Sequence, residues 1–194
     1  MTIEWESTMI RNVEIIGLES AIQASKYPMA VDVSEVSPEI TKRTLSLGSA
    51  PHGSGHDSFL KGVIVEADVT ATIKFWVEWQ RYHFSDIISS QSTMHRIQKF
   101  NIEESCVEYV SPVIVSEVKR LAFWYNQNPT QENFLKLVYS VPVGLKLTAR
   151  VSTNYLQLKT NKYQRKDHRL PEWRAYCNWI DSLPHFLELT EGKA

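Results

Sequence analysis

The sequence predicts a single α+β domain that spans residues 1–194. One long stretch alternates apolar and polar residues, as a strand does, and it lies between stretches with helical apolar spacing. No repeat, linker or low-complexity tract divides the chain, and 194 residues with 43% hydrophobic content suffice for one sizeable core. We therefore expect strands and helices to pack around a common core.

The clearest predicted element is a long strand over residues 63–73. Its two faces would carry Val63, Val65, Ala67, Val69, Ala71 and Ile73 on one side, and Ile64, Glu66, Asp68, Thr70 and Thr72 on the other. This period of two predicts that the apolar face is buried and the polar face is not. A similar but weaker alternation over residues 9–19 predicts a first strand near the N-terminus.

Two short helices and a loop are predicted between these strands. Residues 19–27 should form a helix that ends before Pro28, because a residue that precedes proline disfavours helical backbone. Residues 37–47 should form a second helix, with Ser37 as its cap and a proline at its first position. The glycine- and serine-rich residues 48–58 are typical of a loop.

The remaining helices are predicted after the long strand. Bulky apolar residues at three- and four-residue spacing predict helices over residues 73–84, 111–127, 128–140 and 171–183, and the second and third of these would form an antiparallel hairpin. Residues 141–169 combine β-branched residues with helix-like spacing near their end, so strand and helix both stay open there. The tryptophans of the flanking helices are expected in the core: Trp76, Trp79, Trp173 and Trp179.

The composition excludes several classes of protein. A net charge of −1, from 21 basic and 22 acidic residues, argues against a bulk nucleic-acid binder. Cys106 and Cys177 are too few for a zinc ligand set or a disulfide scaffold, so both are expected to be reduced and buried. The N-terminal residues 1–10 do not resemble a signal peptide, and no apolar run reaches membrane-spanning length. We expect a cytoplasmic protein that binds neither membrane nor nucleic acid.

Two polar clusters could bind an anion such as a phosphate. The first lies in residues 81–96 and the second in residues 160–169, and each combines cations with hydroxyl or amide groups. Arginine forks assisted by hydroxyls suit phosphate, although a solvated basic surface has the same composition. His52 and His56 lie four residues apart in a loop rather than on a helix, and we expect no metal site there.

The spacing of these residues is similar to that of the flavin-dependent thymidylate synthases. In residues 55–58, Gly55, His56 and Ser58 fit the family segment GHxSxxEH, which precedes a long strand and a helix. With no gap after it, Arg81 falls on the first arginine of the family motif RHRxxSxNxxSxRY. One inserted residue places Ser92, preceded by Gln91, on the serine of that motif.

The C-terminal half resembles the same family independently. Asn154 falls on the leading asparagine of the family region NLRSLxNFLxLRxxxxAQxEIR, and Arg165 follows eleven residues later, at the position of the nucleotide-binding arginine. The resemblance covers roughly residues 55–180 and implies a central antiparallel or mixed sheet flanked by helices, as in thymidylate synthase-complementing proteins.

The chain departs from the family motifs at several positions. The RHR triplet reads Arg81, Tyr82, His83, and the histidine of the EH pair is replaced by Gly62. The asparagine of the long motif falls on Ile88 or Ser89. Its late arginine falls on Met94, with Arg96 nearby. The nucleotide-binding side of the family pattern is therefore better retained than the flavin-binding side.

The resemblance implies an enzyme that converts dUMP to dTMP with FAD, NADPH and methylenetetrahydrofolate. By resemblance, Arg165 and Ser92 are the catalytic candidates, and the substrate-binding candidates are Arg81, Gln91, Ser92, Arg96 and Arg165. The flavin-binding candidates are His56, His83, Asn154, Asn161 and Arg169. The family also implies a homotetramer whose subunits share active sites, and the short, divergent chain would suit a phage or mobile-element protein.

Other interpretations of the same residues stay open. The fold could persist without catalysis, as a nucleotide-binding or assembly protein, and a helical interaction protein without any ligand would also fit the eroded motifs. Arg165 could simply end a helix, Ser92 could cap one, and Asn154 could stand in a turn.

Overall fold

The computed structural model describes residues 9–192 and confirms the α+β class, with one four-stranded antiparallel sheet. The strand order is β1-β2-β4-β3, and the strands are β1 (Ile10–Ile16), β2 (Ile64–Thr72), β3 (Ser85–Ser90) and β4 (Lys146–Asn154). β2 and β4 lie at the centre and pair along their whole length, from Ile64 opposite Asn154 to Thr72 opposite Lys146.

Helices account for most of the remaining chain. The α-helices are α1 (Leu18–Ala24), α2 (Lys42–Gly48), α3 (Ile73–Trp79), α4 (Thr93–Arg96), α5 (Ile102–Ser105), α6 (Pro112–Gln127), α7 (Gln131–Tyr139), α8 (Tyr155–Arg165), α9 (Pro171–Asp181) and α10 (Phe186–Glu191). Short 3-10 turns are η2 (Tyr27–Met29), η3 (Val33–Glu35), η4 (Ser58–Gly62) and η5 (Ile97–Lys99). None of the helices within residues 9–192 is long and apolar enough to cross a membrane.

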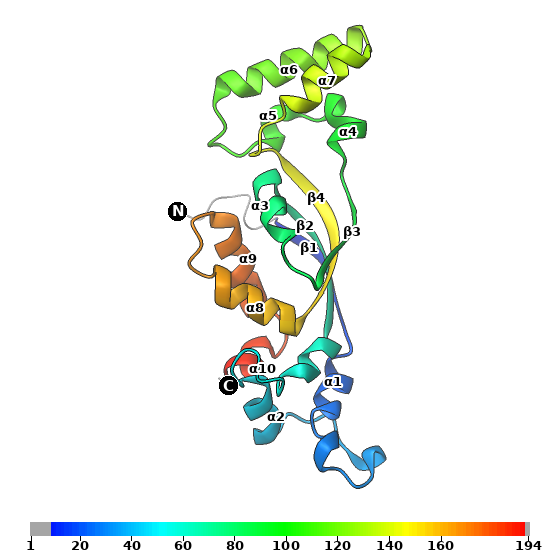
Figure 1. The fold of residues 1–194 in the computed structure, drawn as a ribbon, viewed down its shortest axis with the longest axis vertical. Coiled ribbons are helices and arrows are strands. Elements are labelled where there is room, and N and C mark those ends of the chain that lie inside the picture. Colours follow the sequence, from blue (N-terminus) through cyan, green and yellow to red (C-terminus); the bar gives the residue numbers. More distant parts are fainter. Residues whose placement is uncertain (1–8, 193–194) are drawn as a thin grey trace.

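The molecule is elongated and has three tiers (Figure 1). The sheet forms the middle tier, and α3, α8 and α9 lie against one of its faces. At one end lie α4 to α7, and at the other lie α1, α2 and α10. The sheet therefore presents one helix-covered face and one face that no helix covers in this view.

The alternation predicted for the long strand decides which face of the sheet is buried. Val65 and Val69 of β2 are fully buried under the helices, whereas Glu66 and Asp68 lie on the opposite face, where both are partly exposed. On that open face Arg150 of β4 pairs with both carboxylates and with Glu14 of β1, at 2.8–3.5 Å. Ion pairs between neighbouring strands thus stabilise the polar face of the sheet.

Aromatic side chains fill the core between the sheet and its helices. Phe75, Trp79, Trp173 and Tyr176 are each fully buried, and the ring centroids of Phe75 and Trp173 lie 4.2 Å apart. Trp76 is also buried, and Trp179 packs against this core while partly exposed. The expectation that these tryptophans belong to the core is confirmed.

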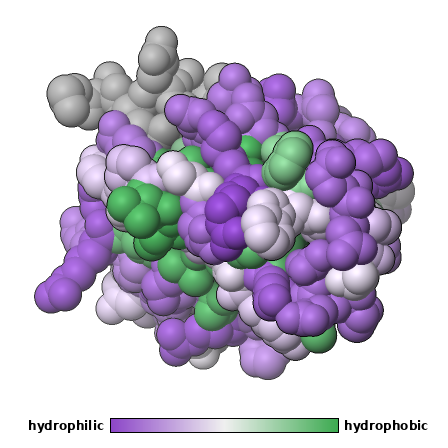
Figure 2. Space-filling model, turned by 90° about the horizontal axis from the view of Figure 1, so that it is seen from above, coloured by the Kyte–Doolittle hydropathy of each residue, from purple (hydrophilic) through white to green (hydrophobic). Residues whose placement is uncertain are grey.

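A second apolar cluster holds the α4–α7 end together. Its buried members include Ile97, Val118, Leu121, Leu137 and Leu145. Figure 2 looks down on this end and shows green apolar patches among hydrophilic side chains. The exposed apolar side chains of α6, α7 and the following loop are Val113, Ile114, Phe123, Trp124, Leu135, Tyr139 and Val143. Apolar surface of this kind commonly marks a contact with another chain.

The structure corrects three expectations about elements. The helix expected over residues 37–47 begins only at Lys42, because Thr41 and Thr44 form a capping box through reciprocal side-chain bonds at 3.2 and 3.4 Å. The helix expected over residues 73–84 ends at Trp79, and part of residues 81–96 forms an edge strand, β3. The ambiguous residues 141–169 divide into β4 and α8, with Asn154 as the cap that ends one and begins the other. The α6–α7 hairpin and the helix over 171–183 are confirmed.

Gly17, which joins β1 to α1, is expected to tolerate no side chain. Its φ is +80°, and a Cβ atom there would meet the carbonyl oxygen of Gly62 at 2.4 Å. Gly17→Ala should lower the free energy of unfolding by about 3 kcal/mol, from left-handed strain and a backbone clash. Gly53→Ala is the matched control, since Gly53 has φ +82° and open space around it. Chemical denaturation should show a clearly smaller loss for the control, and equal losses would contradict the clash.

Candidate functional site

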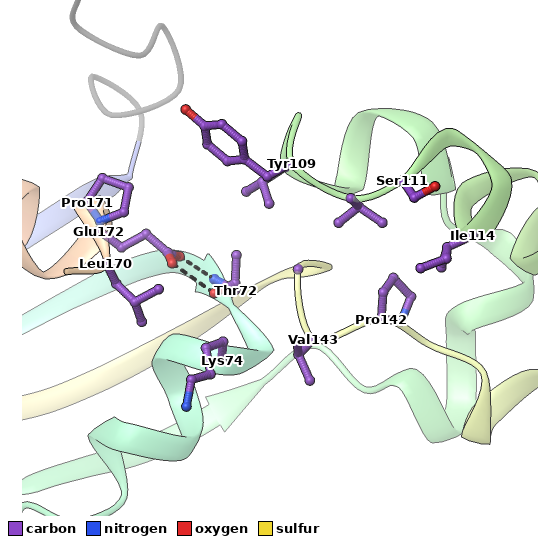
Figure 3. A pocket seen from close by; sticks show the side chains of 13 residues that line it. Thr72, Lys74, Tyr109, Ser111, Ile114, Pro142, Val143, Leu170, Pro171 and Glu172 are labelled. Atoms are coloured by element: carbon purple, nitrogen blue, oxygen red, sulfur yellow. Dashed lines mark hydrogen bonds between the residues drawn. The ribbon is translucent and has the colours of Figure 1, made fainter.

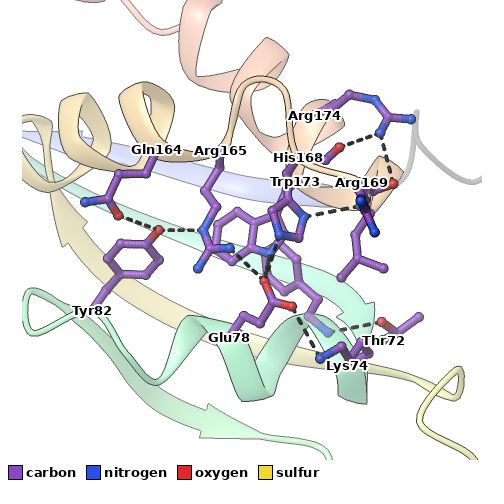
Figure 4. A network of polar contacts seen from close by, with 12 residues as sticks. Thr72, Lys74, Glu78, Tyr82, Gln164, Arg165, His168, Arg169, Trp173 and Arg174 are labelled. Carbon is purple, nitrogen blue, oxygen red and sulfur yellow. Dashed lines mark hydrogen bonds and ion pairs between the residues drawn. The ribbon is translucent and has the colours of Figure 1, made fainter.

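Glu78, in the last turn of α3, lies at the centre of a polar cluster that joins α3, α8 and α9 (Figure 4). Its Oε2 accepts hydrogen bonds from an Arg165 guanidinium nitrogen at 2.8 Å and from the Trp173 indole at 3.1 Å. His168 Nε2 lies 3.2 Å from the same oxygen, and Lys74 Nζ lies 3.4 Å from Oε1. The carboxylate is therefore held by donors from three helices and the loop between α8 and α9.

Arg165, the last residue of α8, is the least exposed cation of this cluster. Its Nε donates to the Tyr82 hydroxyl at 2.8 Å, and its Cζ lies 4.9 Å from the Trp173 ring and 5.7 Å from the Tyr82 ring. The side chain is only 12% exposed. Aromatic contacts and charge-assisted bonds together restrict the guanidinium to one orientation. Its remaining nitrogen, NH2, donates to no other group within residues 9–192.

His168 places a neutral imidazole beside the Glu78 carboxylate. Desolvation lowers the pKa of its imidazole, although the Glu78 carboxylate opposes this shift. Its Nδ1 accepts a bond from the Leu170 backbone at 3.2 Å, so the proton of the neutral ring is on Nε2 and points to Glu78. Near neutral pH, the Glu78 carboxylate is therefore balanced mainly by Arg165 and Lys74.

The structure brings the two predicted arginine segments together. Arg81 lies directly after α3 with an exposed side chain, and the neighbouring Tyr82 contacts Arg165. Tyr82 stands at the middle position of the family's RHR triplet, so a departure from the motif is what joins the two segments here. His83, the third residue of the triplet, is exposed.

The other substrate-binding candidates lie apart from Arg165 within one chain. Gln91 exchanges two bonds of 2.9 Å with the Thr148 backbone, which extends the edge strand. Residue 148 lies about 20 Å along β4 from residue 154, where α8 begins. Ser92 and Arg96 follow Gln91 into α4, at the α6–α7 end of the molecule (Figure 1). Ser92 bonds His95 Nδ1 at 2.8 Å and stands at the cap position of α4, where its side chain makes no capping bond.

The five flavin-binding candidates are divided between the surface and the core. His56, His83 and Arg169 are exposed. Asn154 ends β4 and caps α8 by accepting a bond from the Gln157 backbone at 2.9 Å, so it does not stand in a turn. Asn161 is fully buried, and its side-chain oxygen accepts a bond from the Gln157 side chain at 2.7 Å. Asn161 therefore has a structural role within this chain.

The two cysteines are buried thiols. Both Cys106 and Cys177 are free thiols and buried, as predicted from the sequence. Burial raises the pKa of the Cys177 thiol to about 12. The thiol stays protonated near neutral pH, and a protonated thiol is a poor nucleophile.

Sequence reasoning missed the central residue of the cluster, Glu78. The available signal was weak: Glu78 follows Lys74 by four residues on a helix, a spacing that usually indicates only a surface ion pair. Its contacts with Arg165 and Trp173 span 87 and 95 residues of sequence. Such contacts depend on how α8 and α9 fold back over α3.

Comparisons with known proteins found similarity in structure but none in sequence. The sequence matches no known family and no curated protein. A solved structure, the flavin-dependent thymidylate synthase ThyX from Helicobacter pylori complexed with FAD and dUMP, superposes with a TM-score of 0.70 at 15% identity. The superposition covers 94% of this chain and 99% of the Helicobacter pylori chain. A second structure of Helicobacter pylori ThyX with FAD and dUMP superposes with a TM-score of 0.70 at 16% identity, over 91% of this chain and 95% of its own. The chain therefore has the fold of the flavin-dependent thymidylate synthases.

Proposed function

We propose that the chain is a divergent flavin-dependent thymidylate synthase. It would methylate dUMP reductively to dTMP, with FAD as cofactor and NADPH and methylenetetrahydrofolate as co-substrates. The observation that carries the proposal is the fold, which agrees over 94% of the chain with that of an enzyme complexed with FAD and dUMP. The meeting of the Arg81 and Arg165 segments supports it, because both are substrate-binding candidates.

The roles of the chain's own residues follow from the cluster around Glu78. The free nitrogen of Arg165 would donate to a carbonyl oxygen of the pyrimidine, where negative charge develops during the reaction. The guanidinium is already oriented by Tyr82 and Trp173, so its orientation costs little when the substrate binds. Arg81 is exposed, directly precedes Tyr82, and would pair with the nucleotide phosphate.

The fit of the chain to FAD is partial. The exposed Arg169, His83 and His56 can reach a cofactor, and Arg169 can pair with its pyrophosphate. The buried Asn161 does not fit, and Asn154 uses its oxygen to cap α8. When bound, FAD would supply the hydride for the reduction. We therefore assign the cofactor to the three exposed residues, with the remaining contacts from another subunit.

The separation of Ser92 and Arg96 from Arg165 is consistent with a site shared between subunits. Exposed apolar side chains on α6 and α7, among them Phe123 and Trp124, supply a surface through which copies could associate. We propose a cytoplasmic homotetramer, in which Ser92, Gln91 and Arg96 of one copy approach the Arg165 of another. In that assembly Ser92 would bind the substrate next to Arg165.

A second function is favoured by the ion pair between Glu78 and Arg165. The carboxylate lies 2.8 Å from the guanidinium and offsets its charge. This reduces the electrostatic stabilisation that Arg165 can offer to an enolate-like pyrimidine. A nucleotide-binding protein that keeps the fold without turnover would be compatible with this arrangement.

Ligand-binding and turnover measurements on the purified protein distinguish these two functions. Protein that binds FAD should be yellow, with an absorbance maximum at about 450 nm from the conjugated isoalloxazine ring. Tritium release from dUMP labelled at the reacting carbon should then follow when NADPH and methylenetetrahydrofolate are added. Flavin binding or dUMP binding without tritium release would favour the second function. A colourless protein that takes up neither FAD nor dUMP would contradict both.

A further inference from the structure

A cavity of about 460 Å³ lies between the sheet tier and the α6–α7 end and borders the Arg165 cluster at Lys74. It is bounded by the junction of β2 and α3, the loop before α6, the loop before β4, and the start of α9 (Figure 3). Its walls are mostly apolar and include Val107, Val110, Ile114, Pro142, Val143 and Leu170. This size and lining are typical of small-molecule sites, which span roughly 300–1,000 Å³.

One carboxylate, that of Glu172, lies in this apolar wall. Glu172 is 3% exposed, and its two oxygens accept bonds from the Thr72 backbone nitrogen at 2.7 Å and the Thr72 hydroxyl at 2.9 Å. Figure 3 shows the side chain reaching across the cavity wall to Thr72. Each oxygen accepts a single bond within residues 9–192, and a carboxylate oxygen can accept two.

No cation of the described chain neutralises Glu172. No lysine, arginine or histidine nitrogen within residues 9–192 lies within 4.0 Å of its oxygens. Lys74 also lines the cavity, but its ammonium pairs with Glu78 at 3.4 Å. Burial raises the pKa of Glu172 and the charge of Glu78 adds to that shift, whereas the two Thr72 bonds and the more distant charge of Lys146 oppose it. A desolvated carboxylate without a cation is costly, so a cationic ligand would be favoured at this position.

We propose that this cavity binds a flat, largely apolar molecule that carries an amidinium or guanidinium group, with two N–H donors directed at the Glu172 carboxylate. The two parallel donors of such a group match the free acceptor positions of a carboxylate. The apolar body would lie against Val110, Ile114 and Val143. The site differs from the proposed nucleotide site in the charge it selects, because Glu172 would repel a phosphate, although the two share Lys74 at their border.

Three matched probes test the charge requirement on the full-length protein. Benzamidine has the proposed head group, benzamide is its neutral analogue and benzoate is its anionic analogue. Titration calorimetry should show binding of benzamidine, at least about tenfold weaker binding of benzamide, and no binding of benzoate. Equal binding of benzamidine and benzamide, or no binding of benzamidine, would overturn the proposal.

Two variants locate the binding. Glu172→Gln keeps an acceptor for Thr72 and removes the charge, so it should weaken benzamidine binding about tenfold or more while leaving benzamide binding unchanged. Val143→Trp fills the cavity from its exposed rim and leaves Glu172 intact, so it should weaken both ligands. Because Val143 is 60% exposed, this variant should fold even if Glu172→Gln does not. Full benzamidine affinity in Val143→Trp would place the ligand elsewhere.

The pH dependence of benzamidine binding gives an independent readout. Protonation removes the charge of Glu172, so affinity should fall as pH is lowered through its raised pKa, while benzamidinium stays charged. The charged groups that influence Glu172 are Glu78 on α3 and Lys146 on β4, and Lys74, which also lines the cavity, pairs with Glu78. The fall should be absent in Glu172→Gln, and an identical fall in that variant would assign the titration to another group.

Discussion

Replacing Arg165 with alanine should abolish dUMP binding and also destabilise the fold. The guanidinium is the only cation within 3 Å of the Glu78 carboxylate in the described chain, and both side chains are less than 15% exposed. Its removal leaves a nearly buried carboxylate without its main partner, which typically costs about 3 kcal/mol. Calorimetry with dUMP measures the first effect, and chemical denaturation measures the second.

A double variant separates the two effects. In Arg165→Ala/Glu78→Gln, the orphaned charge is gone, so most of the lost stability should return while dUMP still does not bind. Arg165→Lys keeps the charge but cannot reproduce the bond to Tyr82 together with the bond to Glu78, and it should bind dUMP weakly. Wild-type dUMP affinity in Arg165→Ala would refute the role of this residue in substrate binding.

Truncation of Trp173 should be the most destabilising single change in the core. The indole is fully buried, packs 4.2 Å from the Phe75 ring and 5.8 Å from the Tyr176 ring, and donates to Glu78. Trp173→Ala should lower the free energy of unfolding by about 3–5 kcal/mol, because it leaves a large cavity. Urea denaturation, with an unchanged slope, measures this directly.

A surface tryptophan provides the control for Trp173. Trp124 on α6 is 55% exposed, and its main contact is the Arg120 guanidinium, 5.1 Å from its ring centroid. Trp124→Ala should lower the free energy of unfolding by at most about 1 kcal/mol. If the two variants unfold at the same urea concentration, the core assigned to Trp173 is wrong.

Elements with a strong periodic pattern were predictable from the sequence. In β2 every second residue from Val65 to Ala71 is buried, and α9 buries Trp173, Tyr176 and Ile180 as their spacing predicts. The edge strand β3 was not predictable, because only Ser85 of its six residues is buried and its pattern carries no apolar face. Its strand conformation comes from pairing with β4. Pairing with β2 likewise decides that residues 146–154 form a strand.

The candidate site likewise has features that the sequence predicted and features that it did not. The resemblance of the Arg81 and Arg165 segments to the family motifs implied that they converge, and they do so through Tyr82. The contact of Glu78 with Arg165 was not predictable, since it depends on the path of α8 across α3. The positions of Ser92 and Arg96, at the far end of the sheet, follow from the register of β3 against β4.

The sequence by itself determined the α+β class, the buried face of β2, the helical hairpin and the two arginine segments, because each depends on local periodicity or spacing. Only the tertiary structure decided that Glu78 pairs with Arg165 and that Glu172, in the wall of a mostly apolar cavity, forms no ion pair within residues 9–192. Those features arise where helices from distant parts of the chain meet, and the energy of a charge is set by the groups that surround it in space.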